Sequence, residues 1–380
     1  MRLQASILSL ASLFICLLLL SLWPRNTVIK NTRVEAQEAF RPVRLAECQK
    51  IDFHTHFDPG AERRALILMD QFNISCAVNL TGMPAGDLLQ PYLDMESAFS
   101  GRLLTFAGID WRLLKHPHFG EAMADNLREA IKQGARGLKI PKALGLMIPA
   151  PEGGLLRIDD PRLDPIFETA GQLGVPIAIH AGDPVAFWEP IEPANPRYDE
   201  LKLNPNWSYH KRPVPSHGEL MQQQVRLFER HPKTTFVAVH VAGYAENIVW
   251  VDELLERLPN VFIDVAARVP ELGRQPTDTM RAFFIKNENR ILFGTDLGLG
   301  TNHVMLGAPL PWVIQKEDVI RFFDSTWRYF ETSDRNFEHP TPIQGQWTIN
   351  GLDLPISVQD KLYRKNAIEI LSSRTIKNDK

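Results

Sequence analysis

The sequence predicts an α/β protein, a (β/α)8 TIM-type barrel that follows an N-terminal apolar membrane segment. From Ile51 onward, short apolar or β-branched runs alternate with longer amphipathic stretches, which is the pattern of strand and helix units on a parallel sheet. Eight alternations favour a closed barrel over an open sheet. Runs such as 236–239 are apolar throughout, as expected for strands that are covered on both faces.

Each element of the predicted barrel can be assigned to a range. The expected strands cover residues 51–54, 76–81, 104–109, 135–140, 176–180, 235–240, 260–266 and 290–295. The expected helices cover 61–73, 86–100, 120–133, 161–173, 217–230, 245–257, 273–287 and 316–331, with a last helix at 358–371. Two connections, 181–216 and 297–315, are unusually long and follow strands, so we expect both on the active-site face of the barrel. The first is a candidate lid.

The N-terminus is a separate segment. Residues Ala5 to Trp23 are uncharged and rich in leucine, and their length suits a membrane span. A cleaved signal peptide is the main alternative, although its apolar core is usually shorter; a buried helix is another. We therefore expect a signal anchor or signal peptide at 1–25, a polar tether at 26–46 and the barrel at 47–375. The protein is then membrane-anchored or exported, with the barrel outside the cytoplasm.

Composition excludes some classes of protein. The net charge of -3 and the pI near 6.4 provide no broad basic field, so no nucleic-acid partner is expected. Cys16, Cys48 and Cys76 are widely spaced and form no CxxC pair. Their spacing therefore predicts neither a disulfide framework nor a thiolate zinc site.

Histidine and aspartate residues recur where the predicted strands end. The first strand runs into His54 and His56, and later strands end at His180, His240 and Asp296. Polar side chains at these strand ends face the mouth of a barrel, and residues two apart on a strand share a face. His-x-His alone is a weak signal, but with the other three it predicts a metal site. Imidazole and carboxylate ligands suit zinc or a similar divalent ion, with one position left for water.

These residues, taken as an ordered set, resemble the amidohydrolase-related family. The resemblance rests on Ile-Asp-Phe-His-Thr-His at 51–56, His180, His240, Phe-Gly-Thr-Asp ending at Asp296, and a closing Leu-Tyr-Arg-Lys-Asn-Ala-Ile-Glu-Ile-Leu. It covers residues 50–372 and leaves out the N-terminal segment. The family includes metal-dependent hydrolases and decarboxylases similar to aminocarboxymuconate-semialdehyde decarboxylase.

The resemblance implies a role for each site residue. His54, His56 and His180 would be metal ligands, Asp296 a ligand or the base for a metal-bound water, and His240 the group that polarises substrate or holds that water. The implied cofactor is a divalent metal ion, one Zn²⁺, and no organic cofactor is expected. A divalent ion lowers the pKa of bound water to about 7, and a neighbouring carboxylate can then take up its proton.

Basic residues near the strand ends leave alternatives open. Lys139 ends strand four, where two-metal relatives carry a carbamylated bridging lysine; substrate binding or a structural ion pair are the other interpretations. Arg268 follows strand seven and could bind an anionic substrate or form a buried salt bridge. Lys142 is expected to be a solvated or ion-paired loop charge.

Other polar loop residues are less informative. His116 and His118 follow strand three between prolines and loop residues, so we interpret them as solvated rather than as a second metal site. Trp207, Tyr209 and His210 lie in the candidate lid and would either close over substrate or pack the loop onto the barrel.

Three functions remain open. The first is a metal-dependent hydrolase acting on an ester, lactone or amide bond of a small organic acid. The second is a metal-dependent decarboxylase with the same site, and the third is a non-catalytic binding module on a degenerate barrel. The expected partners are a small-molecule substrate and, through the N-terminus, a membrane; a homodimer is left open.

Overall fold

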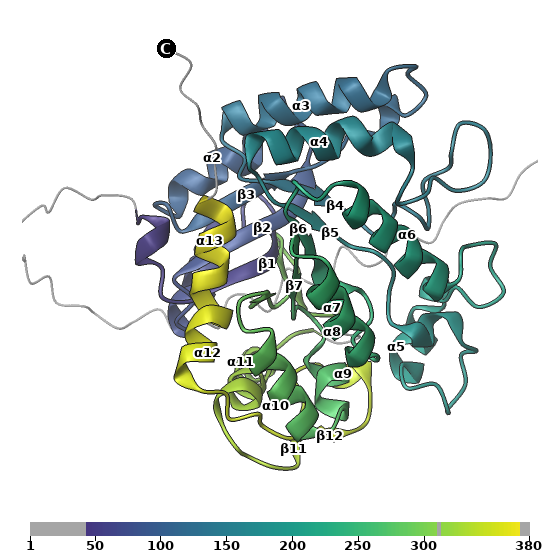
Figure 1. Cartoon of the computed structure of the whole chain (residues 1–380). Coiled ribbons are helices and arrows are strands. Elements are labelled where there is room, and N and C mark those ends of the chain that lie inside the picture. The colour runs from purple at the N-terminus through teal and green to yellow at the C-terminus, as the bar shows by residue number, and fades with distance from the viewer. Residues whose placement is uncertain (1–42, 310–312, 373–380) are drawn as a thin grey trace, which may run out of the picture. The chain divides into compact units, whose positions relative to one another are not determined.

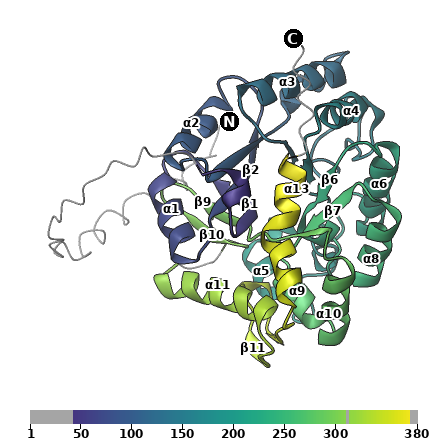
Figure 2. The same ribbon diagram turned by 60° about the vertical axis from the view of Figure 1, so that its left-hand side comes forward.

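The computed structural model describes residues 43–309 and 313–372. They form an α/β fold whose main sheet has ten strands in the order β10-β9-β1-β2-β3-β4-β5-β6-β7-β8. Neighbouring strands from β1 to β8 run parallel. The sheet is curled, and helices surround it (Figures 1 and 2). This architecture confirms the predicted α/β class with a parallel sheet, and the curl of the sheet is consistent with a TIM-type barrel.

Each predicted strand and helix has a counterpart. The strands are β1 (Ile51–Phe57), β2 (Cys76–Met83), β3 (Leu103–Ala107), β4 (Leu138–Ile140), β5 (Ile177–Ile179), β6 (Phe236–Ala238), β7 (Val261–Asp264), β8 (Ile291–Leu292), β9 (Leu297–Leu299) and β10 (Val304–Leu306), with a separate hairpin of β11 (Phe337–Glu338) and β12 (Thr348–Ile349). The helices are α1 (Glu62–Gln71), α2 (Gln90–Ala98), α3 (Phe119–Gln133), α4 (Asp164–Leu173), α5 (Tyr198–Leu203), α6 (His217–Arg230), α7 (Val239–Ala242), α8 (Ile248–Arg257), α9 (Val269–Arg274), α10 (Thr277–Lys286), α11 (Lys316–Glu331), α12 (Ile356–Asp360) and α13 (Asn366–Ser372).

Local sequence sets where the helices begin and end. The Ser216 side chain caps α6 by accepting a hydrogen bond from the Glu219 backbone N–H, and Asn247 caps α8 in the same way. Gly174, with φ of 63°, ends α4 in the left-handed conformation that glycine adopts without steric cost. These residues therefore set the start of α6, the start of α8 and the end of α4.

The eighth strand is split where it meets the first. Its two parts, β8 and β9, pair with β7 and β1 respectively. Between them, the Phe53 N–H donates to the Phe293 carbonyl at 2.9 Å, and the Asp296 N–H donates to the His54 carbonyl at 2.8 Å. The predicted single strand at 290–295 is therefore wrong in detail, and the seam between the last strand and the first is held by these two bonds.

The inside of the curled sheet is apolar at the end where the strands begin. Phe53, Val78, Phe106 and Val237 belong to one buried cluster with apolar residues of α13 such as Ile370. Figure 2 shows α13 lying across the strands. The polar groups of the candidate site lie at the opposite end, where the strands end.

A disulfide joins the starts of the first two strands. Cys48 and Cys76 are 28 residues apart in the sequence, but their Cα atoms lie 5.8 Å apart. The spacing of these cysteines in the sequence does not indicate a disulfide, and the structure shows that one forms. The two residues come together only because β1 and β2 pair with Ile51 opposite Cys76, which is a tertiary contact that spacing does not reveal.

No helix within residues 43–309 and 313–372 is long and apolar enough to cross a membrane. The predicted apolar segment at 1–25 and the tether up to residue 42 lie outside the described residues.

Replacing Cys48 and Cys76 together by serine should lower the free energy of unfolding by about 3 kcal/mol. The reason is that the disulfide reduces the conformational entropy of the unfolded chain. Urea unfolding of the oxidised wild type, the reduced wild type and the double variant measures this. A reductant should lower the free energy of unfolding of the wild type and leave that of the double variant unchanged. Equal stability of all three would show that the bond contributes nothing.

Candidate metal centre

The His54 side chain is fixed by a buried carboxylate. His54 lies on β1 and is fully buried, and its Nδ1 is 2.8 Å from Oδ2 of Asp264 at the end of β7. Burial, followed by the charge of Lys139, holds the pKa of His54 well below its usual value. The neutral ring therefore donates from Nδ1 to Asp264 and leaves Nε2 unprotonated, with Nζ of Lys139 3.5 Å away. An unprotonated Nε2 is what a metal ligand needs.

The same carboxylate fixes His240. Its backbone N–H donates to Oδ1 of Asp264 at 2.7 Å, and its Nδ1 donates to the Ala266 carbonyl at 2.8 Å. Burial, followed by the charge of Arg268, lowers the pKa of His240 to about 3. His240 thus also has a free Nε2 at neutral pH.

The turn that presents His240 is strained. The predicted strand at 235–240 ends early, at Ala238, and His240, Val241 and Ala242 all have φ of 56–57°. Left-handed backbone costs about 1–2 kcal/mol for each residue with a Cβ, and a β-branched residue rarely adopts it. Strain of this kind persists where the surroundings impose it, and here Asp264 holds the His240 N–H.

Asp296 completes the centre from the seam of the sheet. It has φ of 61°, and its Oδ1 is 3.5 Å from Nε2 of His54 and 3.3 Å from Nε2 of His56. Burial raises the pKa of Asp296, but the hydrogen bond from His56 and the neighbouring imidazoles outweigh burial and hold this pKa well below its usual range. The carboxylate is therefore ionised at neutral pH.

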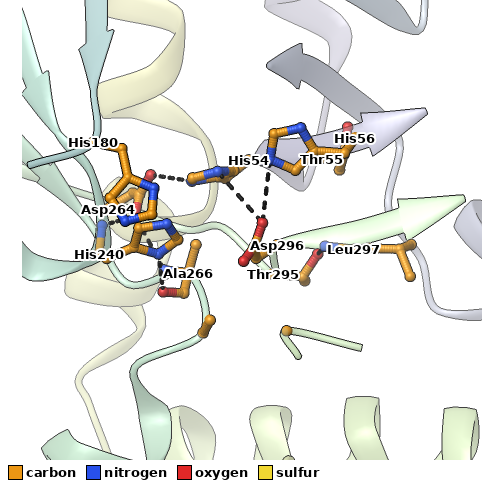
Figure 3. A network of polar contacts seen from close by, with 12 residues as sticks. His54, Thr55, His56, His180, His240, Asp264, Ala266, Thr295, Asp296 and Leu297 are labelled. Carbon is orange, nitrogen blue, oxygen red and sulfur yellow. Dashed lines mark hydrogen bonds and ion pairs between the residues drawn. The ribbon is translucent and has the colours of Figure 1, made fainter. Parts of the chain in front are cut away.

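Within the described part of the chain, ligand atoms of His54, His240 and Asp296 all lie within 4.8 Å of one another. Figure 3 shows their side chains turned toward a common space, together with His56 and His180. His56 and His180 are not members of this tighter group, although the rings of His180 and His240 are only 4.3 Å apart. The predicted assignment of His54, His56, His180 and Asp296 as ligands and His240 as a catalytic group stays a prediction.

The residues present fit a divalent ion. Nε2 of His180 is buried and has no hydrogen-bond partner among residues 43–309 and 313–372; the Asp183 carboxylate is 3.8 Å away. Burial, followed by the charge of His240, holds the pKa of His180 well below its usual value. A neutral imidazole with an unsatisfied nitrogen, beside two more imidazoles and a carboxylate, is a donor set that suits zinc and similar ions.

Two carboxylates of the centre were missed by the sequence interpretation. Asp264 orients both His54 and His240, and Asp52 accepts hydrogen bonds from the backbone of His54 and Thr295 and from the Thr295 hydroxyl. Burial raises the pKa of Asp52 to about 7. Both are acidic residues inside predicted strands, and this placement was the available signal.

The basic residues around the centre differ in their partners. Nζ of Lys139 lies 3.5 Å from Nε2 of His54, and burial lowers its pKa to about 8. Lys142 is ion-paired with Asp183 at 2.9 Å, as expected for a loop charge. Arg268 is buried, and its only hydrogen bond within residues 43–309 and 313–372 is to the Ala267 carbonyl. The alternative of a buried salt bridge at Arg268 is therefore not observed there.

A cavity of about 340 Å³ joins these groups. Its lining includes His56, Lys139, Lys142, His180, Asp183, Phe187, Trp207, His240, Arg268, Asp296 and Gln344. Trp207 thus reaches the cavity from the candidate lid, whereas Tyr209 donates to Asp183 and His210 lies beside the Trp188 carbonyl, which packs the loop. His116 and His118 are exposed and are not part of this lining.

Comparison with known proteins identifies the family. A family model described as amidohydrolase matches residues 51–372. The chain therefore belongs to the amidohydrolase family, and the resemblance inferred from its sequence motifs is confirmed. It is an enzyme of this family, a hydrolase or a decarboxylase, and the family typically uses a divalent metal. No curated protein matches the sequence.

Solved structures share the fold at low identity. 2,6-Dihydroxybenzoate decarboxylase from Rhizobium is 15% identical, with a TM-score of 0.51 over 86% of this chain and 99% of that one. A putative amidohydrolase from Staphylococcus aureus is 16% identical, with a TM-score of 0.50 over 85% and 99%. A probable 2-pyrone-4,6-dicarboxylic acid hydrolase from Acinetobacter baumannii is 12% identical, with a TM-score of 0.47 over 85% and 99%.

Asp264→Asn should lower metal affinity about 10- to 100-fold, because the amide cannot hold the His54 tautomer as the carboxylate does. Competition with a fluorescent zinc chelator measures this affinity. Asp324→Asn, on the exposed face of α11, is the matched control and should bind zinc like the wild type. Unchanged affinity in Asp264→Asn would contradict the orienting role.

Proposed function

We propose that the protein is a metal-dependent hydrolase that cleaves an ester, lactone or amide bond of a small organic acid. One observation carries this proposal: His54, His240 and Asp296 converge within 4.8 Å, beside a cavity that Arg268 also lines. The imidazole nitrogens and the carboxylate can hold a divalent ion, and the buried guanidinium can hold the acid group of a substrate.

The proposed cofactor is one Zn²⁺, held by His54, His56, His180 and Asp296, with His240 at the substrate. When bound, a divalent ion makes water a nucleophile at neutral pH and polarises a carbonyl group. Asp296 is ionised and can take up the proton that the attacking water loses. The low pKa of His240 leaves its Nε2 unprotonated in the resting enzyme, so this nitrogen can hold the attacking water by accepting a hydrogen bond from it.

Arg268 is the proposed anchor for the substrate carboxylate. Its guanidinium has five N–H donors, and the Ala267 carbonyl uses one side of it. No carboxylate pairs directly with Arg268 within the described part of the chain. An unpaired buried cation is costly, and a bound carboxylate would satisfy it with a bidentate pair. Lys139 adds a second charge to the same cavity and is proposed to contact the substrate as well.

Decarboxylation of a carboxylated substrate is the second candidate. The specific observation in its favour is that Lys139 and Arg268 line one cavity, since these cations would attract a substrate carboxylate, the group that leaves as CO₂. Hydrolysis and decarboxylation differ in their products, and this difference separates them experimentally.

Further features belong to the proposal. We propose that the curled sheet is a fully closed (β/α)8 barrel and that the N-terminal segment anchors or exports it. The disulfide between Cys48 and Cys76 supports a location outside the cytoplasm, because such bonds persist in oxidising compartments.

Turnover is expected with zinc-loaded protein on a panel of small carboxylated lactones, esters and amides in water enriched in ¹⁸O. Hydrolysis places ¹⁸O in the product carboxylate, which mass spectrometry detects. Asp296→Asn should lower kcat by at least about 100-fold. Release of CO₂ without ¹⁸O uptake would favour the decarboxylase, and full activity of Asp296→Asn would contradict the role of Asp296.

Arg268→Met should raise KM by about tenfold or more and change kcat less, because it removes a charge-assisted bond that substrate makes before reaction. Arg257→Met, exposed on α8, is the control. A fall in kcat of about tenfold with an unchanged KM would show that Arg268 does not serve to bind the substrate.

A further inference from the structure

A residue far from the strand ends also reaches the cavity. Gln344 lies in the segment between α11 and α12, at the end of a short 3-10 turn, Pro342–Gln344. It lines the same cavity as His240, Asp296 and Arg268, and it is 2% exposed. Sequence interpretation assigned no role to this segment.

The turn that carries Gln344 is held rigidly. His339 accepts a hydrogen bond from the Thr341 N–H at Nδ1, 3.3 Å away, so its Nε2 donates to the Gly345 carbonyl at 3.0 Å. The indole N–H of Trp347 donates to the Pro270 carbonyl at 3.0 Å. Pro270 belongs to α9, which begins directly after Arg268, so one packed unit presents both Arg268 and Gln344.

The Gln344 amide leaves its oxygen free. Its Nε2 donates to the Gly307 carbonyl at 3.4 Å, which sets the orientation of the amide, because the reverse orientation would bring two oxygens together. Oε1 is buried and has no hydrogen-bond partner within the described residues. An unsatisfied buried acceptor is destabilising, and such a group in a native structure calls for an explanation.

The chemistry of the cavity indicates what satisfies this oxygen. Lys139 and Arg268 supply positive charge and donors for a carboxylate. Oε1 of Gln344 is instead an acceptor, so it attracts a hydroxyl or N–H group and disfavours a second carboxylate. The cavity therefore offers cations for a carboxylate and an acceptor oxygen for a hydroxyl or N–H group of the same ligand.

We propose that Gln344 is a specificity-determining residue, whose Oε1 accepts a hydrogen bond from a hydroxyl or N–H group of a substrate whose carboxylate binds Arg268. The inference rests on the proposed function for the position of the substrate. It narrows the substrate class to acids that carry a hydrogen-bond donor. A site built around a buried polar group rejects an analogue that leaves this group unpaired.

Matched pairs of acids test this inference on the full, zinc-loaded chain. The probes are benzoate with its 2-, 3- and 4-hydroxy derivatives, and succinate with malate, titrated by isothermal calorimetry. Wild type should bind at least one hydroxylated acid about tenfold more tightly than its plain partner. Gln344→Met should abolish this preference without weakening the binding of the plain acid.

Two further variants serve as controls for the effect of Gln344→Met. Gln344→Leu also removes the acceptor oxygen, with a different side-chain shape, and should lose the preference as Gln344→Met does. Gln346→Met is the matched control, because Gln346 is exposed on the same segment, and it should behave like wild type. Thermal melting of each variant shows whether the fold survives.

The outcomes separate this inference from the proposed function. Absence of a preference in wild type, including absence of binding, or a preference that survives in Gln344→Met, would overturn the role of Gln344. Binding is measured without turnover, so a clear preference in a protein that cleaves no ester, lactone or amide would leave Gln344 in place and remove the hydrolase.

Discussion

The buried carboxylate of Asp264 is the interaction on which the rest of the site depends. One oxygen faces Nδ1 of His54, and the other accepts the backbone N–H of His240. A single side chain at the end of β7 thus fixes the tautomer of one imidazole and the strained turn that presents another. Burial raises the pKa of Asp264, whereas the backbone hydrogen bond from His240 and the charge of Lys139 lower it. Both favour the ionised carboxylate, which accepts hydrogen bonds from His54 and His240.

The seam of the sheet supplies the remaining part of the centre. Asp52 on β1 binds the backbone and hydroxyl of Thr295, and the next residue, Asp296, donates its N–H to the His54 carbonyl. The bonds that join the last strand to the first therefore also place the Asp296 carboxylate beside His54. The contacts that join the last strand to the first and the contacts that assemble the site therefore involve the same residues.

Much of this could be predicted from the sequence, for a physical reason. Strand and helix periodicity is local, and polar residues at strand ends must gather where parallel strands end, so His54, His180, His240 and Asp296 were identifiable. The orienting carboxylate of Asp264, the left-handed turn at His240 and the contact of Cys48 with Cys76 depend on pairing between distant segments. Gln344 reaches the cavity only because its segment packs on α9.

The central claim is that these side chains hold a catalytic metal ion. Its most direct test is the metal content of the full chain, purified without chelator and analysed by elemental mass spectrometry beside His54→Ala. The account predicts about one zinc or similar divalent ion per chain in wild type and its loss in the variant. No bound metal in wild type after addition of zinc, or equal content in both proteins, would contradict it.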